Sequence, residues 1–339
     1  MHPLTFPLLH LLAGGDFHSG EVMARTLGVS RASVWNALHG LDIPGLEVFK
    51  VRGRGYRLAQ PLRMLDAAGI TRELAANAPR FSVEVIDQVE STNSLLLQRS
   101  AAGARSGSVI AAEWQTQGRG RRGQAWHAIP GASLTFSLLW RFQQGAGFLA
   151  GLSLAAGVAV ARVLNALGVQ DVGLKWPNDV WCRGGKLAGV LIEMHGDMLG
   201  PSAVVLGLGL NFRLPDALRE RIDQPAVGLE SVCNVAPDHN RVLAMLLTEL
   251  AQVLDNFAQH GFVPVRDEWQ RHHIFQNKAV QLTLPDGSVV SGVALAVATS
   301  GALVLETAAG QRQFHSGEVS LRDGERAPVG MNATQRGAL

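Results

Sequence analysis

The segment LKWPNDVWCRGGKLAGVLIEM, residues 174–194, joins two apolar runs through a turn. The run at 174–176 ends at Pro177, which fixes φ and favours a turn, and the run at 187–194 has the length of a buried strand. We therefore predict two strands, with Asn178 and Asp179 at the tip of the first and Lys186 at the start of the second. Taken alone, such a lysine is usually a strand-end charge, and the Pro-Asn-Asp stretch could be a simple turn.

Apolar runs and longer helical patterns alternate on both sides of this segment, from about residue 81 to residue 272. This alternation predicts one α/β domain, placed at residues 64–275, with a connecting helix at 62–79. The expected strands are 81–85, 109–114, 134–140, 174–176, 187–194 and 203–210, and the expected helices are 92–102, 149–167, 240–260 and 264–272.

The C-terminal part, residues 276–324, carries three further apolar runs at 279–284, 289–298 and 303–306. They are separated by Pro285-Asp286-Gly287 and by Ser300-Gly301, which are typical hairpin turns. This pattern predicts a small β-barrel-like domain. The polar tail at 325–339 is expected to be disordered.

Residues 1–63 predict a helix-turn-helix followed by a wing. Ser19 and Gly28 can cap the two ends of one helix, and Ser30 can cap the next after a short apolar turn. The run at 48–58 alternates like two strands with basic residues at their tip. This order favours DNA binding over a helical domain that is merely solubilised by its charges, because phosphate contacts need basic residues on projecting elements. The candidate DNA-contacting residues are Ser30, Arg31, Ser33, Trp35, Asn36, Arg52 and Arg54.

Composition and charge narrow the class of protein. The 339 residues are 47% hydrophobic and 17% charged, which excludes an intrinsically disordered chain. The formal net charge is +2, and residues 1–63 hold seven Lys or Arg against four Asp or Glu, so the excess positive charge lies in the predicted DNA-binding part. Two cysteines, Cys182 and Cys233, exclude a disulfide framework and a cysteine-rich zinc site.

The uncharged stretch at 142–161 has nearly the length of a membrane span, but it contains four glycines and two glutamines. We interpret it as a loop that leads into a buried helix. The N-terminus has no basic segment of the kind that begins a signal peptide. The sequence therefore predicts a cytoplasmic protein without a membrane partner.

Gly118-Arg119-Gly120-Arg121-Arg122-Gly123 satisfies the spacing of a dinucleotide-binding fingerprint. That fingerprint should open a helix and be followed by an acid about 20 residues later, whereas Gln143 and Gln144 stand there. Glycines allow close approach of the backbone, and guanidinium groups match phosphate or carboxylate oxygens. We therefore predict a loop that grips an anion, with a surface loop without a ligand as the alternative.

Two further motifs are ambiguous when taken singly. Glu90-Ser91-Thr92-Asn93 stands at a strand-to-helix junction, where its hydroxyl groups could merely cap the helix. Gly207-Leu208-Gly209-Leu210-Asn211 is a strand interrupted by glycines, which suggests a ligand or another backbone lying close against it.

Together and in this order, the motifs closely resemble those of the bacterial biotin protein ligases, in the bifunctional type that also represses biotin-synthesis genes. The resemblance covers nearly the whole chain: the winged helix, Ser91-Thr92-Asn93, the loop at 118–123 with Trp126, and the motifs at 175–179, 186–193, 207–211 and 316–322. It implies a multidomain α+β fold with an N-terminal winged helix-turn-helix, a central α/β ligase domain of the class II aminoacyl-tRNA synthetase/biotin ligase type with a mixed sheet, and a small C-terminal SH3-like β-barrel.

The resemblance also implies an activity and its partners. In such ligases the carboxylate of biotin attacks the α-phosphate of ATP, and the resulting biotinyl-5′-adenylate gives its biotinyl group to a lysine of the biotin carboxyl carrier protein of acetyl-CoA carboxylase. ATP and biotin are the substrates, Mg²⁺ is the expected metal, and a ligand-promoted homodimer on operator DNA of biotin-synthesis genes is the expected repressor.

Residue roles follow from the resemblance, position by position. Lys186 and Arg121 are the expected catalytic residues, and Asp179 is the expected Mg²⁺ ligand. The residues expected to bind biotin are Ser91, Thr92, Asn93, Gln115, Arg119, Gly120, Arg121, Lys186, Gly189 and Leu191. Those expected to bind ATP or the adenylate are Gly118, Arg119, Arg121, Trp126, Asn178, Lys186 and Asn211.

One departure and two alternatives stay open at this point. Many relatives carry a lysine directly after the tryptophan of the recognition helix, whereas Asn36 follows Trp35 here, so the operator sequence stays open. A lipoate ligase would share the acyl-adenylate chemistry. A ligand-sensing repressor without ligase activity would share the domains, but the combination of Arg121, Lys186 and Asp179 favours catalysis.

Overall fold

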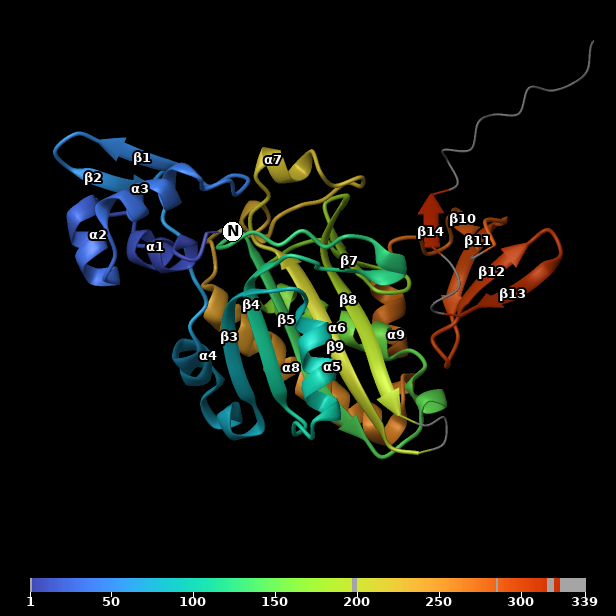
Figure 1. The fold of residues 1–339 in the computed structure, drawn as a ribbon. Helices are drawn as coiled ribbons and strands as arrows, with labels where there is room; N and C mark the ends of the chain where they lie inside the picture. Colours follow the sequence, from blue (N-terminus) through green and yellow to red (C-terminus); the bar gives the residue numbers. More distant parts are fainter. Residues whose placement is uncertain (1, 197–199, 285, 316–319, 324–339) are drawn as a thin grey trace, which may run out of the picture.

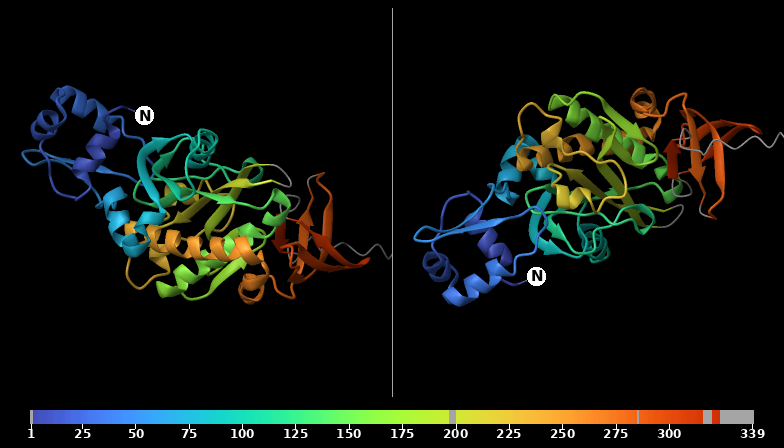
Figure 2. Two further views of the ribbon diagram at one scale, coloured as in Figure 1. Left: turned by 90° about the horizontal axis from the view of Figure 1, so that it is seen from below. Right: turned by 90° about the horizontal axis from the view of Figure 1, so that it is seen from above.

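The computed structural model describes residues 2–196, 200–284, 286–315 and 320–323, the last four by their backbone only. A central body built on a seven-stranded sheet carries the winged helix at one end and a small β domain at the other (Figure 1; Figure 2). The predicted order of three parts is therefore confirmed, while the expected tail at 325–339 lies outside the described residues.

The winged helix consists of α1 (Thr5–Leu12), α2 (Gly20–Leu27) and α3 (Arg31–His39), followed by the hairpin of β1 (Val48–Val51) and β2 (Gly55–Leu58). Ser19 and Ser30 cap α2 and α3 as predicted, since each hydroxyl accepts a bond from a backbone N–H in the first turn. Gly28 ends α2 in the left-handed conformation. The helix-turn-helix and its wing are confirmed.

The expected connecting helix at 62–79 is shorter and comes in two pieces. Residues 61–66 are not helical, α4 covers Ala67–Leu74, and a short 3-10 helix, η1, covers Ala75–Arg80. Asp66 caps α4 by accepting from the backbone N–H groups of Ala68 and Gly69. The segment before α4 is held to the central body instead, because the buried carboxylate of Glu113 accepts from the backbone N–H of Leu65.

The central sheet has the order β3-β4-β5-β9-β8-β7-β6. Among these seven strands only the β3·β4 pair is parallel, and the remaining neighbours are antiparallel, so the predicted mixed sheet is confirmed. The strands are β3 (Ser82–Val89), β4 (Ser108–Gln115), β5 (Ser133–Phe142), β6 (Val172–Lys175), β7 (Asp179–Cys182), β8 (Gly185–Gly196) and β9 (Ser202–Asn211).

Alternating side chains of the central strands pack on opposite faces of the sheet. Leu138 and Leu206 pack into the large core with α6 (Leu152–Ala166) and α8 (His239–His260), whereas Leu139 and Val205 pack with Leu96 of α5 (Thr92–Ala101) on the opposite face. The helix α9 (Val263–His272) and the short pieces η2 (Arg121–Gly123), η3 (Ala146–Leu149), α7 (Asp216–Arg219) and η4 (Leu229–Ser231) complete the central part.

Three details differ from the sequence-based expectations. The strand expected at 174–176 ends at Lys175, before the cis peptide bond between Trp176 and Pro177. The residues after that turn form β7, a strand that the apolar pattern did not indicate because it has only four residues. The predicted helix at 149–167 begins at Leu152, because Gly151 has a φ of 84° and separates it from η3.

The C-terminal strands are β10 (Ala279–Thr283), β11 (Val289–Val297), β12 (Leu303–Thr307), β13 (Gly310–Phe314) and β14 (Ser320–Asp323), in the antiparallel order β13-β12-β11-β10-β14. Strand β13 was not predicted, since its polar sequence lacks an apolar run. The domain contacts the central body through Trp176, whose indole N–H donates to the carbonyl of Gly301 at 3.0 Å. In the described part of the chain, no helix is long and apolar enough to cross a membrane.

Candidate functional site

A cavity of about 1220 Å³ opens where β4, β8 and β9 meet the N-terminus of α5. Its size exceeds that of a pocket for one small molecule, and it suits a ligand built from two parts. The lining includes nearly all residues that the sequence singled out: Ser91, Thr92, Asn93, Gln115, Arg119, Gly120, Arg121, Trp126, Asn178, Asp179, Lys186, Gly189, Leu191 and Asn211. Gly118 is absent from this lining.

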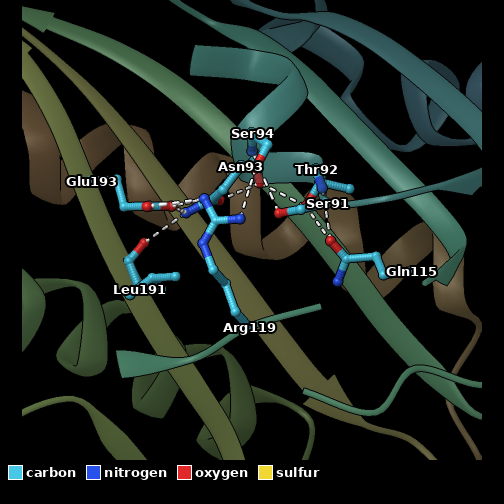
Figure 3. A network of polar contacts seen from close by, with 9 residues as sticks. Ser91, Thr92, Asn93, Ser94, Gln115, Arg119, Leu191 and Glu193 are labelled. Atoms are coloured by element: carbon cyan, nitrogen blue, oxygen red, sulfur yellow. Dashed lines mark hydrogen bonds and ion pairs between the residues drawn. The ribbon is translucent and has the colours of Figure 1, made fainter. Parts of the chain in front are cut away.

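The first turn of α5 presents a hydrogen-bonded polar cluster to the cavity (Figure 3). Ser91 caps the helix through its hydroxyl, so the capping role that the sequence allowed is confirmed. The backbone N–H and the hydroxyl of Thr92 both donate to Gln115 Oε1, at 2.7 and 3.1 Å. Because the oxygen of Gln115 is used in this way, its amide nitrogen is the group that can donate to a ligand.

Asn93 is the most enclosed member of this cluster. Its Nδ2 donates to Glu193 Oε2 at 2.8 Å, and its Oδ1 accepts from the hydroxyl of Ser137 at 2.5 Å. A Cβ at Gly207 would come within 2.3 Å of Asn93 Oδ1, so only glycine leaves room for this side chain. The same argument holds for Gly209, whose Cβ would come within 2.2 Å of the Trp126 ring. The glycine-interrupted strand thus makes room for protein side chains.

The glycine-arginine loop at 118–123 folds back on itself. The N–H of Gly120 donates to the carbonyl of Gln124, and the N–H of Trp126 donates to the carbonyl of Gly118. Arg122 takes a left-handed conformation with φ 55°, and the loop contains only the three-residue η2. A dinucleotide fingerprint would open a long helix, so its exclusion is confirmed. Gly118 supports the loop through its carbonyl, behind the cavity surface.

Two cationic side chains of the cavity, Lys186 and Arg121, differ in the partners that they have within the protein. Lys186 Nζ lies 2.8 Å from Asp179 Oδ1, and both side chains are mostly buried, at 17% and 15% exposure. One terminal nitrogen of Arg121 is buried and has no hydrogen-bond partner within the described residues. Burial, together with the positive charge of Arg122, lowers the pKa of Arg121, while Asp179 acts in the opposite direction. A buried cation with an open donor is suited to an anionic ligand.

Two residues that were expected to contact the nucleotide, Asn178 and Asn211, use their amide nitrogens for hydrogen bonds within the protein. Asn178 Nδ2 donates to the carbonyl of Val190 at 2.8 Å, and Asn211 Nδ2 donates to the carbonyl of Lys186 at 3.3 Å. The side-chain oxygens of both residues can still accept hydrogen bonds. These bonds hold the turn after β6 and the end of β9 against β8, so that Lys186 has a fixed place.

The carboxylate of Asp179 fits a magnesium ion that arrives with a nucleotide. Mg²⁺ is usually bound by one or two carboxylates together with substrate phosphates, and not by a complete protein cage. The described residues contain no group of three or more His, Cys, Asp or Glu side chains that could hold a metal.

Sequence reasoning missed several residues of the site. Ser137 and Glu193 complete the polar cluster, and Trp181, the segment at 221–226 and Lys278 of the C-terminal domain extend the lining. One signal was available: Ser133, Thr135 and Ser137 alternate along an otherwise apolar strand and are all buried. Such a polar stripe on a buried strand indicates a polar site on one face of the sheet.

The candidate DNA-contacting residues lie on the exposed side of the winged helix. Trp35 is 44% exposed on α3 and stacks on His39 with ring centroids 4.8 Å apart. Arg31, Asn36, Arg52 and Arg54 are exposed, whereas the Ser30 and Ser33 hydroxyls bond to each other at 2.9 Å. The guanidinium of Arg54 lies 4.2 Å above the ring of Phe17, which holds it on the wing surface.

Comparison with known proteins gives matches to all three parts of the chain. The Biotin/lipoate A/B protein ligase family matches residues 85–211, the Biotin protein ligase C terminal domain matches residues 275–322, and an HTH domain matches residues 6–57. The chain is 37% identical to the Bifunctional ligase/repressor BirA of Escherichia coli (strain K12), over 94% of this chain and 97% of that protein. It is 29% identical to the BirA of Bacillus subtilis (strain 168), over 91% of this chain and 95% of that protein.

A solved structure has a similar fold over 71% of this chain. The biotin protein ligase from Aquifex aeolicus in complex with biotin and ATP superposes with a TM-score of 0.61 at 26% identity, covering 71% of this chain and 99% of that chain.

Proposed function

The chain belongs to the biotin protein ligase family, with the helix-turn-helix domain of its bifunctional ligase/repressor members, and from this membership we propose how its cavity works. Biotin and ATP bind side by side in the cavity, and the carboxylate of biotin attacks the α-phosphate. Pyrophosphate leaves, and biotinyl-5′-adenylate stays bound. The ε-amine of a lysine on the biotin carboxyl carrier protein then attacks the acyl carbon, and AMP leaves.

Lys186 and Arg121 are the proposed catalytic residues. Joining a carboxylate to a polyphosphate brings negative charges together, and fixed cations lower that barrier most where the charge develops. Lys186 is already fixed by Asp179, and Arg121 offers a buried donor without a protein partner in the described part of the chain. Asp179 is the proposed ligand of Mg²⁺, which when bound offsets the negative charge of the phosphates. No covalent bond to the enzyme is needed.

The substrate sites follow from the distribution of polar groups. The polar cluster of Thr92, Asn93 and Gln115 is suited to the ureido ring of biotin, because that ring both donates and accepts hydrogen bonds. Trp126 is the proposed platform for adenine. The residues proposed to bind biotin are Ser91, Thr92, Asn93, Gln115, Arg119, Gly120, Arg121, Lys186, Gly189 and Leu191, and those proposed for the nucleotide are Arg119, Arg121, Trp126, Asn178, Lys186 and Asn211. Gly118, which the resemblance placed at the nucleotide, is proposed to act only through the loop, whose Trp126 N–H donates to its carbonyl.

The observation that carries the proposal is the meeting of Lys186, Arg121 and the polar cluster in one cavity large enough for both substrates. The test is to incubate the full-length protein with a biotin carrier domain, biotin, ATP and Mg²⁺. Intact mass should show one biotinyl group on the carrier, dependent on ATP and Mg²⁺. Transfer of lipoate instead of biotin would identify the protein as a lipoate-type ligase. Transfer of neither group would favour the alternative of a ligand-sensing repressor without ligase activity.

A repressor role is the second proposal, and it rests on the exposed recognition helix and wing. Within the described residues, the part of β8 at 191–196 pairs with β9 alone, so its other edge is open. Such an edge can pair with a second copy of the same strand. We propose that bound adenylate favours a homodimer through this edge, which places two winged helices on operator DNA of biotin-synthesis genes. The cytoplasmic location stays a prediction from the sequence.

A further inference from the structure

Glu193 lies outside the cavity lining, yet it holds two residues that line it (Figure 3). Its carboxylate on β8 accepts from Asn93 Nδ2 at 2.8 Å and from one terminal nitrogen of Arg119 at 3.0 and 3.1 Å. Asn93 belongs to the first turn of α5, and Arg119 belongs to the glycine-arginine loop. One carboxylate therefore joins a strand, a helix and a loop around the cavity.

The bond to Asn93 determines which way its amide points. A carboxylate can only accept, so the amide nitrogen must face Glu193 and the amide oxygen must face Ser137, whose hydroxyl donates to it. Without an acceptor at position 193, the amide could turn over. The orientation of a polar group at the cavity thus depends on a residue 100 positions away in the sequence.

The bond to Arg119 anchors the loop. Its guanidinium also donates to the hydroxyl of Ser94 at 2.7 Å, so it bridges α5 and β8. The Arg119 side chain is 34% exposed and that of Glu193 is 28% exposed, which places the pair at the rim. The next residues, Gly120 and Arg121, line the cavity. The loop is therefore fixed immediately before two residues that line the cavity.

We propose that Glu193 is a positioning residue with two separable effects: its charge anchors the closed glycine-arginine loop through Arg119, and its capacity as an acceptor orients Asn93 toward biotin. Arg119 acts in this arrangement as the anchor of the lid. The inference rests on the proposed function of this cavity, in which the loop retains biotinyl-adenylate.

Two substitutions of Glu193 separate the effects. Glu193→Gln keeps an acceptor for the Asn93 amide but removes the charge that holds Arg119, whereas Glu193→Ala removes both. The measurements are the rate at which preformed, labelled biotinyl-adenylate escapes from the full-length protein, and the affinity for biotin alone. Glu193→Gln should raise the escape rate about tenfold, as for the loss of about 1.4 kcal/mol, with biotin affinity within about twofold of wild type. Glu193→Ala should weaken both.

A double-mutant cycle tests the pair itself. Arg119→Ala should raise the escape rate as Glu193→Gln does, and the double variant should not exceed the larger single effect, because either substitution alone already breaks the ion pair. Glu84→Gln is the matched control, since it removes the more exposed ion pair of Glu84 with Arg99 outside the cavity. It should leave the escape rate unchanged.

The inference is overturned if Glu193→Gln retains adenylate as wild type does, or if the two single effects add in the double variant. Thermal unfolding verifies that each variant folds. If Glu193→Ala does not fold, the nearly isosteric Glu193→Gln still tests whether the charge of Glu193 anchors the loop. Failure of the wild-type protein to make adenylate would contradict the proposed function instead, so the two failures can be told apart.

Discussion

Lys186 is paired with Asp179, with Nζ 2.8 Å from Oδ1. The lysine is therefore held in place, and in the proposed function it contacts the negative charge that moves toward pyrophosphate. Lys186→Ala should slow biotinyl-adenylate formation by on the order of 10² or more, as expected when one transition-state charge interaction is removed. Rapid-quench measurement of adenylate gives this rate. Arg72→Ala, an exposed cation on α4, is the control and should behave as wild type.

Arg121 should affect retention as well as chemistry, because it lies on the loop that covers the cavity. In the proposed function this buried cation faces the adenylate, so its removal should loosen closure. Arg121→Gly should let adenylate leak, so that lysines of bystander proteins become biotinylated without selection. Mass spectrometry of a mixture of carrier and bystander proteins measures this. Selective labelling by the variant would show that Arg121 does not retain the ligand.

His239 is buried at the start of α8. Burial lowers the pKa of His239 from its usual 6.5 to about 4. Between these values the unfolded chain binds a proton that the folded chain does not, so stability falls as pH drops from about 6.5 to about 4, by up to roughly 3 kcal/mol. His239→Gln should reduce the slope of this part of the profile, while His273, whose pKa burial also lowers to about 4, keeps its own contribution.

Thermal unfolding across that pH range tests the His239 prediction. His260→Gln, at the exposed C-terminal end of the same helix, is the matched control and should keep the wild-type profile. Equal profiles for His239→Gln and the wild type would contradict the assignment of this pH dependence to His239.

At the scale of secondary structure elements, strand β9 determines the shape of the nucleotide side of the cavity. A Cβ at Gly209 would come within 2.2 Å of the Trp126 ring, so an alanine there must displace the indole. Gly209→Ala should weaken ATP binding by at least about tenfold, as expected when an aromatic ring no longer stacks on the base. Isothermal titration measures it. Gly147→Ala, which meets nothing within 4 Å, is the control, and equal ATP affinity in the two variants would contradict the adenine platform.

At the scale of the whole molecule, the winged helix is packed on the ligase body. Its apolar core continues into Ile129 and Ala132, which follow the glycine-arginine loop, and into Leu214 and Leu218, which follow β9. Segments on both sides of the cavity thus contribute to the core of the DNA-binding domain.

The wing should supply phosphate contacts to operator DNA. Arg52→Ala or Arg54→Ala should weaken binding and lower the dependence of log K on log salt by about 0.9 for each phosphate that the variant no longer neutralises, without a change in ligation. Gel shifts at several salt concentrations, with carrier biotinylation as the parallel assay, measure both. An unchanged salt slope in both variants would place the DNA contacts elsewhere.

Ligand binding, dimerisation and DNA binding should be thermodynamically coupled in this protein. Biotinyl-adenylate should tighten both self-association and operator binding, because a ligand shifts an equilibrium toward the state that it binds better. Sedimentation and gel shifts, each with and without biotinyl-adenylate, measure the two effects. Tight operator binding by the ligand-free protein would contradict the coupling.

The order of the domains and the alternation of strands and helices in the central part could be predicted from local signals, namely caps such as Ser19 and Ser30 and apolar runs in strands. The mixed sheet and most of the cavity lining could be expected from the resemblance to biotin protein ligases, because its motifs are short stretches of neighbouring residues. Only the folded structure shows which distant side chains pair with the motif residues. Asn93 meets Ser137 and Glu193 across 44 and 100 positions, and Glu193 in turn meets Arg119. Strand pairing and helix packing set such distances, and no local pattern encodes them.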